Sequence, residues 1–254
     1  MISVGLDNYY HYFEQFGLKQ RTGIDLPGEA GTIMHKKEDM GNVELATVAF
    51  GQSFQITAIQ LLTTASSIIN GGNRITPHFG IEALNRDGEV EETFSYPVQT
   101  GIVSEETSAT MRYILEMVVA EGSGRNGQVQ GFRVGGKTGT AQKYDETGKV
   151  KEGAHLSSFI AFAPANDPKI AILFMVDEAD TYNDYGGTVA APYVGQILED
   201  TLKYMKVEPQ LTEEEQKEQK EEEKKVAQAE SVMGMGREDA VAALEKQGYK
   251  VTVN

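Results

Sequence analysis

Three strand-like stretches follow one another in the sequence and constrain the fold more than any other part of the chain. They cover about 131–142, 156–163 and 169–177, and each is apolar or alternates apolar with polar residues, as strands do. Polar connections with turn residues separate them. This order predicts an antiparallel meander. The uninterrupted apolar run 170–176 predicts a central strand that is covered on both faces.

Helical patterns lie on both sides of these stretches in the sequence. The segments with helical spacing are about 7–16, from Asn42 up to Ala49, from Thr57 to Gly71, from Ser104 to Gly122, and about 190–205. Thr57 and Ser104 suit the N-cap position, because a hydroxyl can accept a hydrogen bond from the first helical turn. Asp87 and Gly88 predict a hairpin within 73–100. Together these elements predict an α+β fold, with an antiparallel sheet covered by helices.

The first strand-like stretch contains the residues best suited to chemistry. Lys137, Thr138, Gly139 and Thr140 place a cation, two hydroxyls and bare backbone within four residues. Because strand residues alternate between faces, Lys137 and Gly139 share one face and the two threonines share the other. Such donors bind carboxylates, which predicts an anionic ligand. The same residues also fit an ordinary edge strand with a solvated lysine, so both interpretations stay open at this point.

The charge of the chain argues against some classes of partner. It has 38 acidic and 23 basic side chains, which gives a net charge of -15 at pH 7. Nucleic acids and anionic membrane surfaces both attract clustered lysine and arginine, so neither is expected to bind. The absence of cysteine excludes disulfides and a thiol nucleophile. No apolar run reaches the ~20 residues of a membrane helix, and residues 1–12 do not resemble a signal peptide.

The composition changes near the C-terminus. Residues 213–225 contain seven glutamates and four lysines without a large apolar residue, which predicts a linker or an exposed helix. A short end-piece with a helical pattern and then a strand pattern follows it. We therefore predict a main domain at 1–206, a charged linker at 207–228 and a small end-piece at 229–254.

Two groups of polar residues resemble metal sites only superficially. His35 with Glu38 and Asp39 lacks a second histidine at ligand spacing. The acidic loop after the third strand misses the calcium-loop pattern and is expected to be solvated. Its acidic members are Asp177, Glu178, Asp180 and Asp184. Neither a metal nor a cofactor is therefore expected. The stretch 50–56 fits a substrate-side wall and core packing equally well.

Six short motifs follow one another along residues 1–206. They are FGQSFQITAIQ at 50–60, NGG at 70–72, TPH at 76–78, GGKTGTAQ at 135–142, SFIAFAPA at 158–165 and YGGTVAAP at 185–192. In this order they resemble the transpeptidase domain of class B penicillin-binding proteins. The resemblance implies the fold shared with serine β-lactamases, here incomplete at its N-terminus. The end-piece resembles the first half of a PASTA module, which follows the transpeptidase in some Gram-positive members of the family, including the sporulation-specific type.

The resemblance implies an acyl-serine mechanism. In this family a serine attacks the D-Ala-D-Ala end of a peptidoglycan stem peptide, and β-lactams acylate the same serine. The motifs S-x-x-K and S-x-N supply nucleophile and base, and K-T-G completes the site. No serine from Ser3 to Ser231 has a lysine three residues later or an asparagine two residues later. Both motifs are therefore expected upstream of Met1, and this chain alone is expected to be inactive.

The resemblance also implies roles for the residues that remain. Lys137 supplies positive charge near the substrate carboxylate, and the Thr138 and Thr140 hydroxyls donate hydrogen bonds to it. The Thr140 N–H forms half of the oxyanion hole, Gly139 leaves room for the acyl group, and Gln142 joins the substrate-binding set. The parent protein is expected at the extracytoplasmic face of the bacterial membrane, anchored by an upstream helix. Its expected partners are stem peptides, β-lactams and other cell-wall synthesis proteins.

Two other interpretations stay open. The chain could be a non-catalytic product that keeps only a substrate-binding or cell-wall-binding surface. It could also derive from a serine β-lactamase or carboxypeptidase of the same superfamily, which shares K-T-G but would not carry the PASTA-like end-piece.

Overall fold

The structure, a computed structural model, describes residues 4–147, 149–210 and 232–246. It contains two compact units, which are Met1–Val129 with Arg133–Val207, and Gln130–Phe132 with Glu208–Asn254. Every candidate site residue lies in the first unit. Within the described ranges, no helix is both long enough and apolar enough to cross a membrane.

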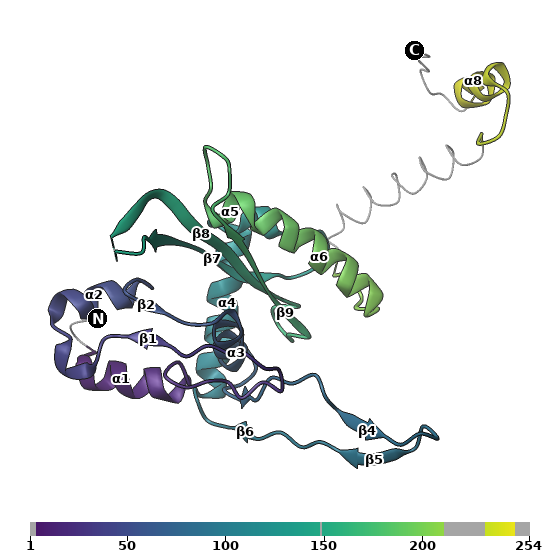
Figure 1. Cartoon of the computed structure of the whole chain (residues 1–254). Helices are drawn as coiled ribbons and strands as arrows, with labels where there is room; N and C mark the ends of the chain where they lie inside the picture. Colours follow the sequence, from purple (N-terminus) through teal and green to yellow (C-terminus); the bar gives the residue numbers. More distant parts are fainter. Residues whose placement is uncertain (1–3, 148, 211–231, 247–254) are drawn as a thin grey trace. The chain divides into compact units, whose positions relative to one another are not determined.

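A three-stranded antiparallel sheet lies at the centre of the first unit (Figure 1). Its strands are β7 (Gly135–Tyr144), β8 (Val150–Ala163) and β9 (Ile170–Asp177). They pair in chain order, with Thr138 opposite Phe159 and Phe159 opposite Phe174. The predicted antiparallel meander is therefore confirmed, and with it the helix-and-sheet α+β fold.

The position of β9 in this sheet shows one prediction to be wrong. The apolar run 170–176 predicts a central strand, whereas β9 is an edge strand of this sheet and none of its residues is fully buried. The central strand is β8, in which Phe159, Ala161 and Ala163 have no exposed surface. The run is apolar for another reason. One face of β9 packs on a helix, where Phe174 stacks on Tyr193, and the other face lines a cavity.

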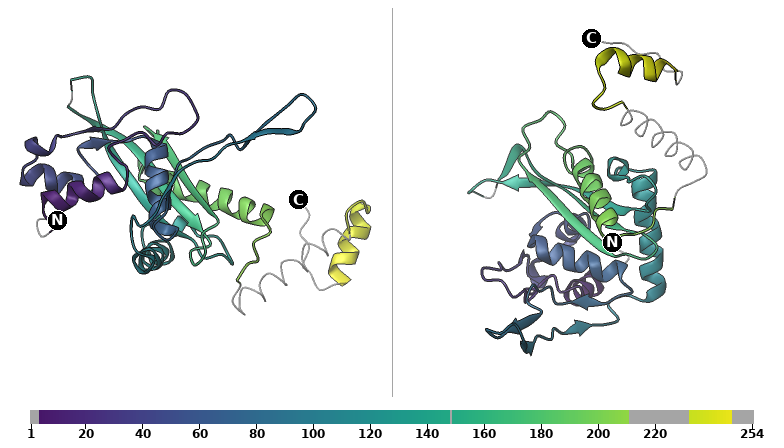
Figure 2. Two further views of the ribbon diagram at one scale, coloured as in Figure 1. Left: turned by 90° about the horizontal axis from the view of Figure 1, so that it is seen from below. Right: turned by 90° about the vertical axis from the view of Figure 1, so that its right-hand side faces the viewer.

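Helices cover the two faces of the sheet at different places (Figure 2). The helices are α3 (Ala58–Ile69), α4 (Glu105–Ala120), α5 (Gly186–Val189) and α6 (Ala191–Tyr204), with the short 3-10 helix η2 (Arg125–Gly127). α6 packs on η2, β8 and β9, α4 packs on β7, and the one-turn α5 contacts all three strands. On the opposite face from Phe159, Phe162 packs with Ile69 of α3 and Leu115 of α4. The predicted helices at 104–120 and 190–205 are confirmed, and both pack on the sheet.

The N-terminal part of the first unit is built from short elements. They are α1 (Leu6–Gln15), β1 (Ile33–Met34), η1 (Lys37–Asp39), α2 (Asn42–Ala49) and β2 (Phe54–Gln55). α3 begins as predicted, because the Thr57 hydroxyl accepts a hydrogen bond from the Gln60 N–H at 3.2 Å. The Gln60 side-chain oxygen in turn accepts a hydrogen bond from the Thr57 N–H at 2.8 Å, which completes a capping box. Ser104 caps α4 through the Thr107 N–H at 3.1 Å.

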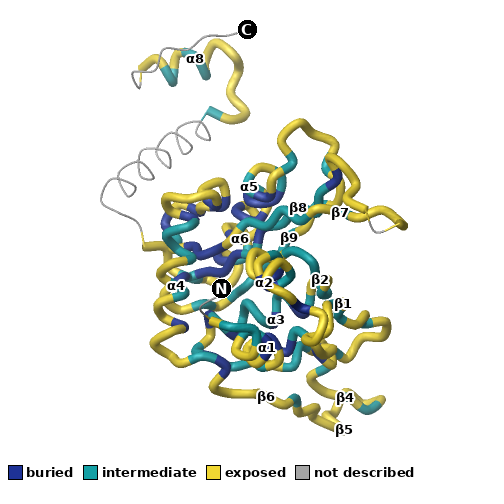
Figure 3. The backbone as a smooth tube through the Cα atoms, turned by 90° about the vertical axis from the view of Figure 1, so that its left-hand side faces the viewer, coloured by how far each residue is buried: buried dark blue, intermediate teal, exposed yellow. Residues whose placement is uncertain are grey.

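A hairpin projects from the first unit between α3 and α4 (Figure 1), and most of its residues in β4 and β5 are exposed (Figure 3). It consists of β3 (Arg74–Ile75), β4 (Glu82–Leu84), β5 (Val90–Thr93) and β6 (Val98–Gln99). The predicted turn at Asp87 and Gly88 is present, and Gly88 has the positive φ of 83° that glycine adopts without strain. At the base of the hairpin, the Asp25 carboxylate accepts hydrogen bonds from the N–H groups of Phe79 and Gly80.

The second unit contains the helix α8 (Arg237–Lys246), in agreement with the helical pattern of the end-piece. The predicted strand after it and most of the predicted charged linker lie outside the described residues. The domain boundaries at 206 and 228 and the PASTA-like nature of 229–254 therefore stay predictions.

Candidate active site

The K-T-G residues lie on an edge strand, as the sequence predicts. β7 pairs with β8 along one side only within the described sheet, so its other edge is unpaired. Lys137 is exposed, and Thr138, Gly139 and Thr140 are half-buried. Edge-strand backbone offers N–H and C=O groups to an extended ligand. The strand therefore presents a cation, two hydroxyls and free backbone along one accessible edge.

Both threonine hydroxyls have protein partners on one side of β7. The Thr138 hydroxyl lies 3.1 Å from the hydroxyl of Ser123, which follows α4. The Thr140 hydroxyl accepts a hydrogen bond from the Gly186 N–H at 3.3 Å, where α5 begins. A hydroxyl has one proton and two lone pairs, so each threonine retains further bonding capacity. These contacts fix where the two hydroxyls lie before any ligand binds.

Lys137 differs from the lysine nearest to it on the same strand. Its Nζ donates to the carbonyl oxygen of Thr138 at 2.9 Å and takes part in no ion pair within the described residues. Lys143, in contrast, lies 2.7 Å from Asp177 and 2.6 Å from Glu178. Of the two lysines, Lys137 thus carries the positive charge that no carboxylate of the described chain neutralises.

A cavity of about 930 Å³ lies beside β7. The sheet contributes an apolar wall to it. This wall is formed by Leu156, Ile160, Leu173 and Met175. Lys137, Gly139 and Gln142 line the cavity as well, and Gln142 is exposed. The site residues predicted from the sequence therefore all line this cavity, although the hydroxyls of Thr138 and Thr140 are bonded on the opposite face of the strand from Lys137.

The stretch 50–56 both lines the cavity and contributes to the core. All seven of its residues line the same cavity. Phe54 also packs against the buried cluster around Tyr10 and lies edge-on to Phe13, with 5.4 Å between ring centroids. Phe50 is 70% exposed, so it belongs to the cavity wall rather than to the core.

Two residues next to the site form a contact that is not recognisable from the sequence. His155 on β8 and Asp184 before α5 lie 2.7 Å apart through Nδ1 and Oδ2. The hydroxyl of Ser157 donates to the carbonyl oxygen of Asp184. In the sequence His155 is an isolated histidine and Asp184 one member of an acidic loop. Their contact depends on the β8–β9 pairing and on the path of the connection to α5, and no local pattern encodes either.

The acidic loop is not an open ring of carboxylates. Glu178 accepts hydrogen bonds from both Lys143 and Lys151, and these bonds lower the pKa of its carboxyl to about 2. Asp177 is bonded to Lys143, and Asp184 to His155. The carboxylates of Asp177, Glu178 and Asp184 are thus already bonded to lysine or histidine side chains.

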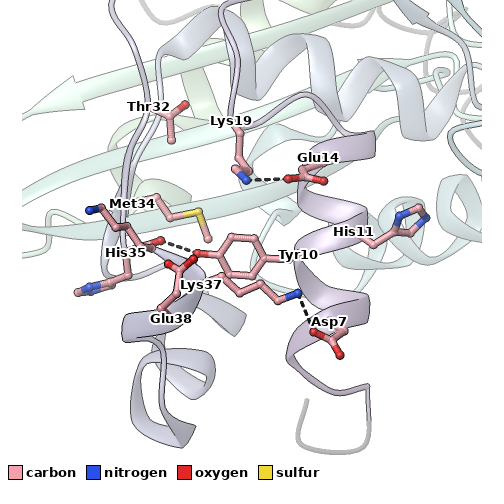
Figure 4. A pocket seen from close by; sticks show the side chains of 11 residues that line it. Asp7, Tyr10, His11, Glu14, Lys19, Thr32, Met34, His35, Lys37 and Glu38 are labelled. Atoms are coloured by element: carbon pink, nitrogen blue, oxygen red, sulfur yellow. Dashed lines mark hydrogen bonds and ion pairs between the residues drawn. The ribbon is translucent and has the colours of Figure 1, made fainter.

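A second pocket, of about 630 Å³, lies between α1 and η1 (Figure 4). Acidic and basic side chains both line this pocket, and two lysines form ion pairs with carboxylates there. Lys37 is 2.7 Å from Asp7, and Lys19 is 2.6 Å from Glu14. This pocket therefore has less uncompensated charge for binding an anion than the edge of β7 has, even with His35, Glu38 and the neighbouring lysines in its lining. The β7 cavity is the better candidate site.

An edge strand with K-T-G, set in a helix-covered antiparallel sheet, defines a protein of the penicillin-recognising transpeptidase class. Residues 2–199 match the family "Penicillin binding protein transpeptidase domain". The chain therefore belongs to this family.

Its relatives act in peptidoglycan synthesis or sporulation according to their names. Stage V sporulation protein D of Bacillus subtilis is 42% identical over 95% of this chain, which covers 37% of that protein. The probable peptidoglycan D,D-transpeptidase PenA of Neisseria meningitidis is 28% identical over 81% of the chain and 33% of its own length. The chain thus spans about a third of the length of these relatives.

Solved structures show the same fold. Penicillin-binding protein 3 of Mycobacterium tuberculosis, complexed with ampicillin, superposes with a TM-score of 0.75 at 29% identity. The match covers 83% of this chain and 48% of that one. The transpeptidase domain of penicillin-binding protein 3 from Burkholderia pseudomallei gives a TM-score of 0.71 at 27% identity, over 83% of this chain and 61% of the other.

Proposed function

We propose that this chain is the carboxylate-binding and oxyanion-stabilising side of a peptidoglycan D,D-transpeptidase. The observation that carries the proposal is the edge of β7, where Lys137 has no carboxylate partner in the described chain and two threonine hydroxyls are already positioned. A stem peptide that ends in D-Ala-D-Ala and a β-lactam share an anionic carboxylate beside the reacting carbonyl. Charge-assisted hydrogen bonds from Lys137, Thr138 and Thr140 would orient that carboxylate.

The chemistry proposed for the parent enzyme is acyl transfer through serine. The serine oxygen attacks the penultimate D-Ala carbonyl and the terminal D-Ala leaves, after which an amine of a second stem peptide takes the acyl group. The Thr140 N–H would donate to the oxygen that becomes negative during attack, and one such donor contributes ~3 kcal/mol to the transition state. We propose that the serine and its base belong to S-x-x-K and S-x-N motifs outside this sequence, because no serine in it has either pattern.

The same proposal covers location and partners. A protein that cross-links peptidoglycan works at the extracytoplasmic face of the membrane, and the names of the relatives support this placement. Stem peptides, β-lactams and other cell-wall synthesis proteins are the proposed partners. We further propose that 1–206 is the transpeptidase part, 207–228 a linker and 229–254 the start of a PASTA module.

A fluorescent penicillin tests the proposal. The 254-residue chain, incubated with it and then denatured, should show no labelled band, because acylation requires a serine with a base in reach. A protein extended upstream to include both missing motifs should be labelled stoichiometrically. Label on a serine of the short chain would contradict the assignment of the nucleophile. An extended protein that stays unlabelled would instead favour the non-catalytic alternative.

A further inference from the structure

The connection from β9 to α5 ends in a segment that is bonded directly to the site. The Gly186 N–H donates to the Thr140 hydroxyl at 3.3 Å, and the Asn126 side-chain amide donates to the Gly187 carbonyl oxygen at 2.7 Å. Since the Gly186 N–H occupies one lone pair of the Thr140 oxygen, the Thr140 proton is directed elsewhere. The position of Gly186 therefore sets the direction in which Thr140 can donate to a ligand.

Two residues of β8 hold this segment just before Gly186. The Asp184 carboxylate lies 2.7 Å from His155 Nδ1, and the Asp184 carbonyl oxygen accepts from the Ser157 hydroxyl. In the sheet, Ser157 pairs with Thr140 and His155 pairs with Gln142. The two residues that hold the segment, His155 and Ser157, are thus paired directly with residues of the proposed ligand-binding strand β7.

The His155–Asp184 contact is partly withdrawn from solvent, unlike the loop that precedes it. The side chains of His155 and Asp184 are 26% and 16% exposed, whereas Tyr182 is completely exposed. A carboxylate that loses most of its water requires hydrogen-bond partners in exchange. The imidazole of His155 supplies such a partner, so the contact is a defined part of the fold rather than a chance surface pair.

We infer that His155 and Asp184 form a positioning pair for the carboxylate site, which fixes Gly186 and through it the Thr140 hydroxyl. The inference rests on the proposed role of Lys137, Thr138 and Thr140 in binding a carboxylate. Neither member of the pair touches the ligand. Each acts by restricting the segment that the Thr140 hydroxyl is bonded to.

Peptide binding to the 254-residue chain tests the inference. N-acetyl-D-alanyl-D-alanine is titrated while the amide NMR signals of residues 139–141 are followed. His155→Ala and Asp184→Ala should each weaken binding about tenfold. The Thr140 hydroxyl would lose its fixed orientation, and its hydrogen bond to the charged ligand carboxylate would be weakened. The double variant should be no weaker than either single one, because both substitutions remove the same interaction.

Two further variants separate positioning from simple loss of structure. His155→Asn should restore much of the affinity, because its amide nitrogen can reach the place of Nδ1 and donate to Asp184. Asp180→Asn, an exposed change in the same loop, should bind as the wild type does. Unchanged affinity in His155→Ala, or no rescue by asparagine, would overturn the inference.

Amide hydrogen exchange keeps the inference testable if the peptide does not bind. In His155→Ala the Gly186 amide should exchange at least tenfold faster, while the amide of Ala161 in the sheet should stay protected. Equal acceleration at both amides would mean general destabilisation and would contradict a positioning role. If the wild-type chain does not bind the peptide but His155→Ala shows the selective acceleration at Gly186, the proposed carboxylate site is refuted and the role of the pair in anchoring the segment stands.

Discussion

Gly186 lies so close to Ser158 that a Cβ at residue 186 would be 2.1 Å from the Ser158 carbonyl oxygen. The same Cβ would be 2.6 Å from the carbonyl oxygen of Gly139. Both oxygens belong to the backbone of paired strands and cannot rotate away. The glycine is therefore required for α5 to begin directly on top of the K-T-G strand.

Gly186→Ala should consequently displace the start of α5 and disconnect it from Thr140. We expect a lower melting temperature for the chain and slower penicillin labelling of the upstream-extended protein. Gly31→Ala is the matched control, since no atom lies within 4 Å of its Cβ position and its φ is not positive. Equal effects of the two substitutions would show that the contact with Ser158 is not restrictive.

Lys137→Ala should reduce the rate of penicillin labelling in the upstream-extended protein by about tenfold to a hundredfold, because it removes a charge-assisted hydrogen bond. The fold should be unaffected, since Lys137 is exposed and takes part in no ion pair of the described residues. Lys149→Ala, an exposed lysine beyond the end of the same strand, serves as the control. Full labelling of Lys137→Ala would remove this lysine from the proposed site.

Glu178 should make the stability of the chain depend on acid pH. Its hydrogen bonds to Lys143 and Lys151 lower the carboxyl pKa from 4.5 to about 2 in the folded state. A lowered folded-state pKa stabilises the fold at a pH above 4.5, and this contribution is lost as the pH falls from 4.5 towards about 2. Glu178→Gln should therefore melt at a lower temperature than wild type at pH 7.

The difference between Glu178→Gln and wild type should shrink steadily below pH 4.5 and disappear only when the pH is well below about 2, because the folded wild-type carboxyl is still about half ionised near pH 2. Thermal melts at a series of pH values measure it. Glu91→Gln, an exposed change on the β4–β5 hairpin, should show no comparable trend. A difference that stays constant with pH would contradict the assigned ion-pair network.

The apolar wall of the β7 cavity should bind a hydrophobic dye. Leu173 and Met175 face this space together with Ile160 of the central strand, and Met175 is 38% exposed. Apolar patches of this kind bind dyes and favour aggregation. We expect the 254-residue chain to enhance anilinonaphthalene sulfonate fluorescence, and Met175→Lys to reduce both the fluorescence and light scattering. Val98→Lys, on the distant β3–β6 pair, should change neither.

The parts of the fold that were predictable depend on local patterns. Strand alternation located β7 and β8, and the hydroxyls of Thr57 and Ser104 marked two helix starts because an N-cap bonds within three residues. The apolar run of β9 misled, because a helix on one face and a cavity wall on the other produce the same composition as a buried central strand.

The parts that were not predictable are contacts between distant residues. The Thr140 hydroxyl meets the amide of a glycine 46 positions away, and His155 meets a carboxylate 29 positions away. Neither residue has a neighbour in the sequence that signals its partner. Only the register of the β8–β9 pairing and the path of the following loop bring them together.

The hydrogen bonds that build the site all connect residues between Ser123 and Gly187. Closing loops of this length costs comparatively little entropy, and hairpin-linked strands form faster than pairings between remote segments. In folding, this stretch is therefore expected to behave as a local unit that closes early. The helices of residues 4–70 would then pack onto a carboxylate-binding site that has already formed.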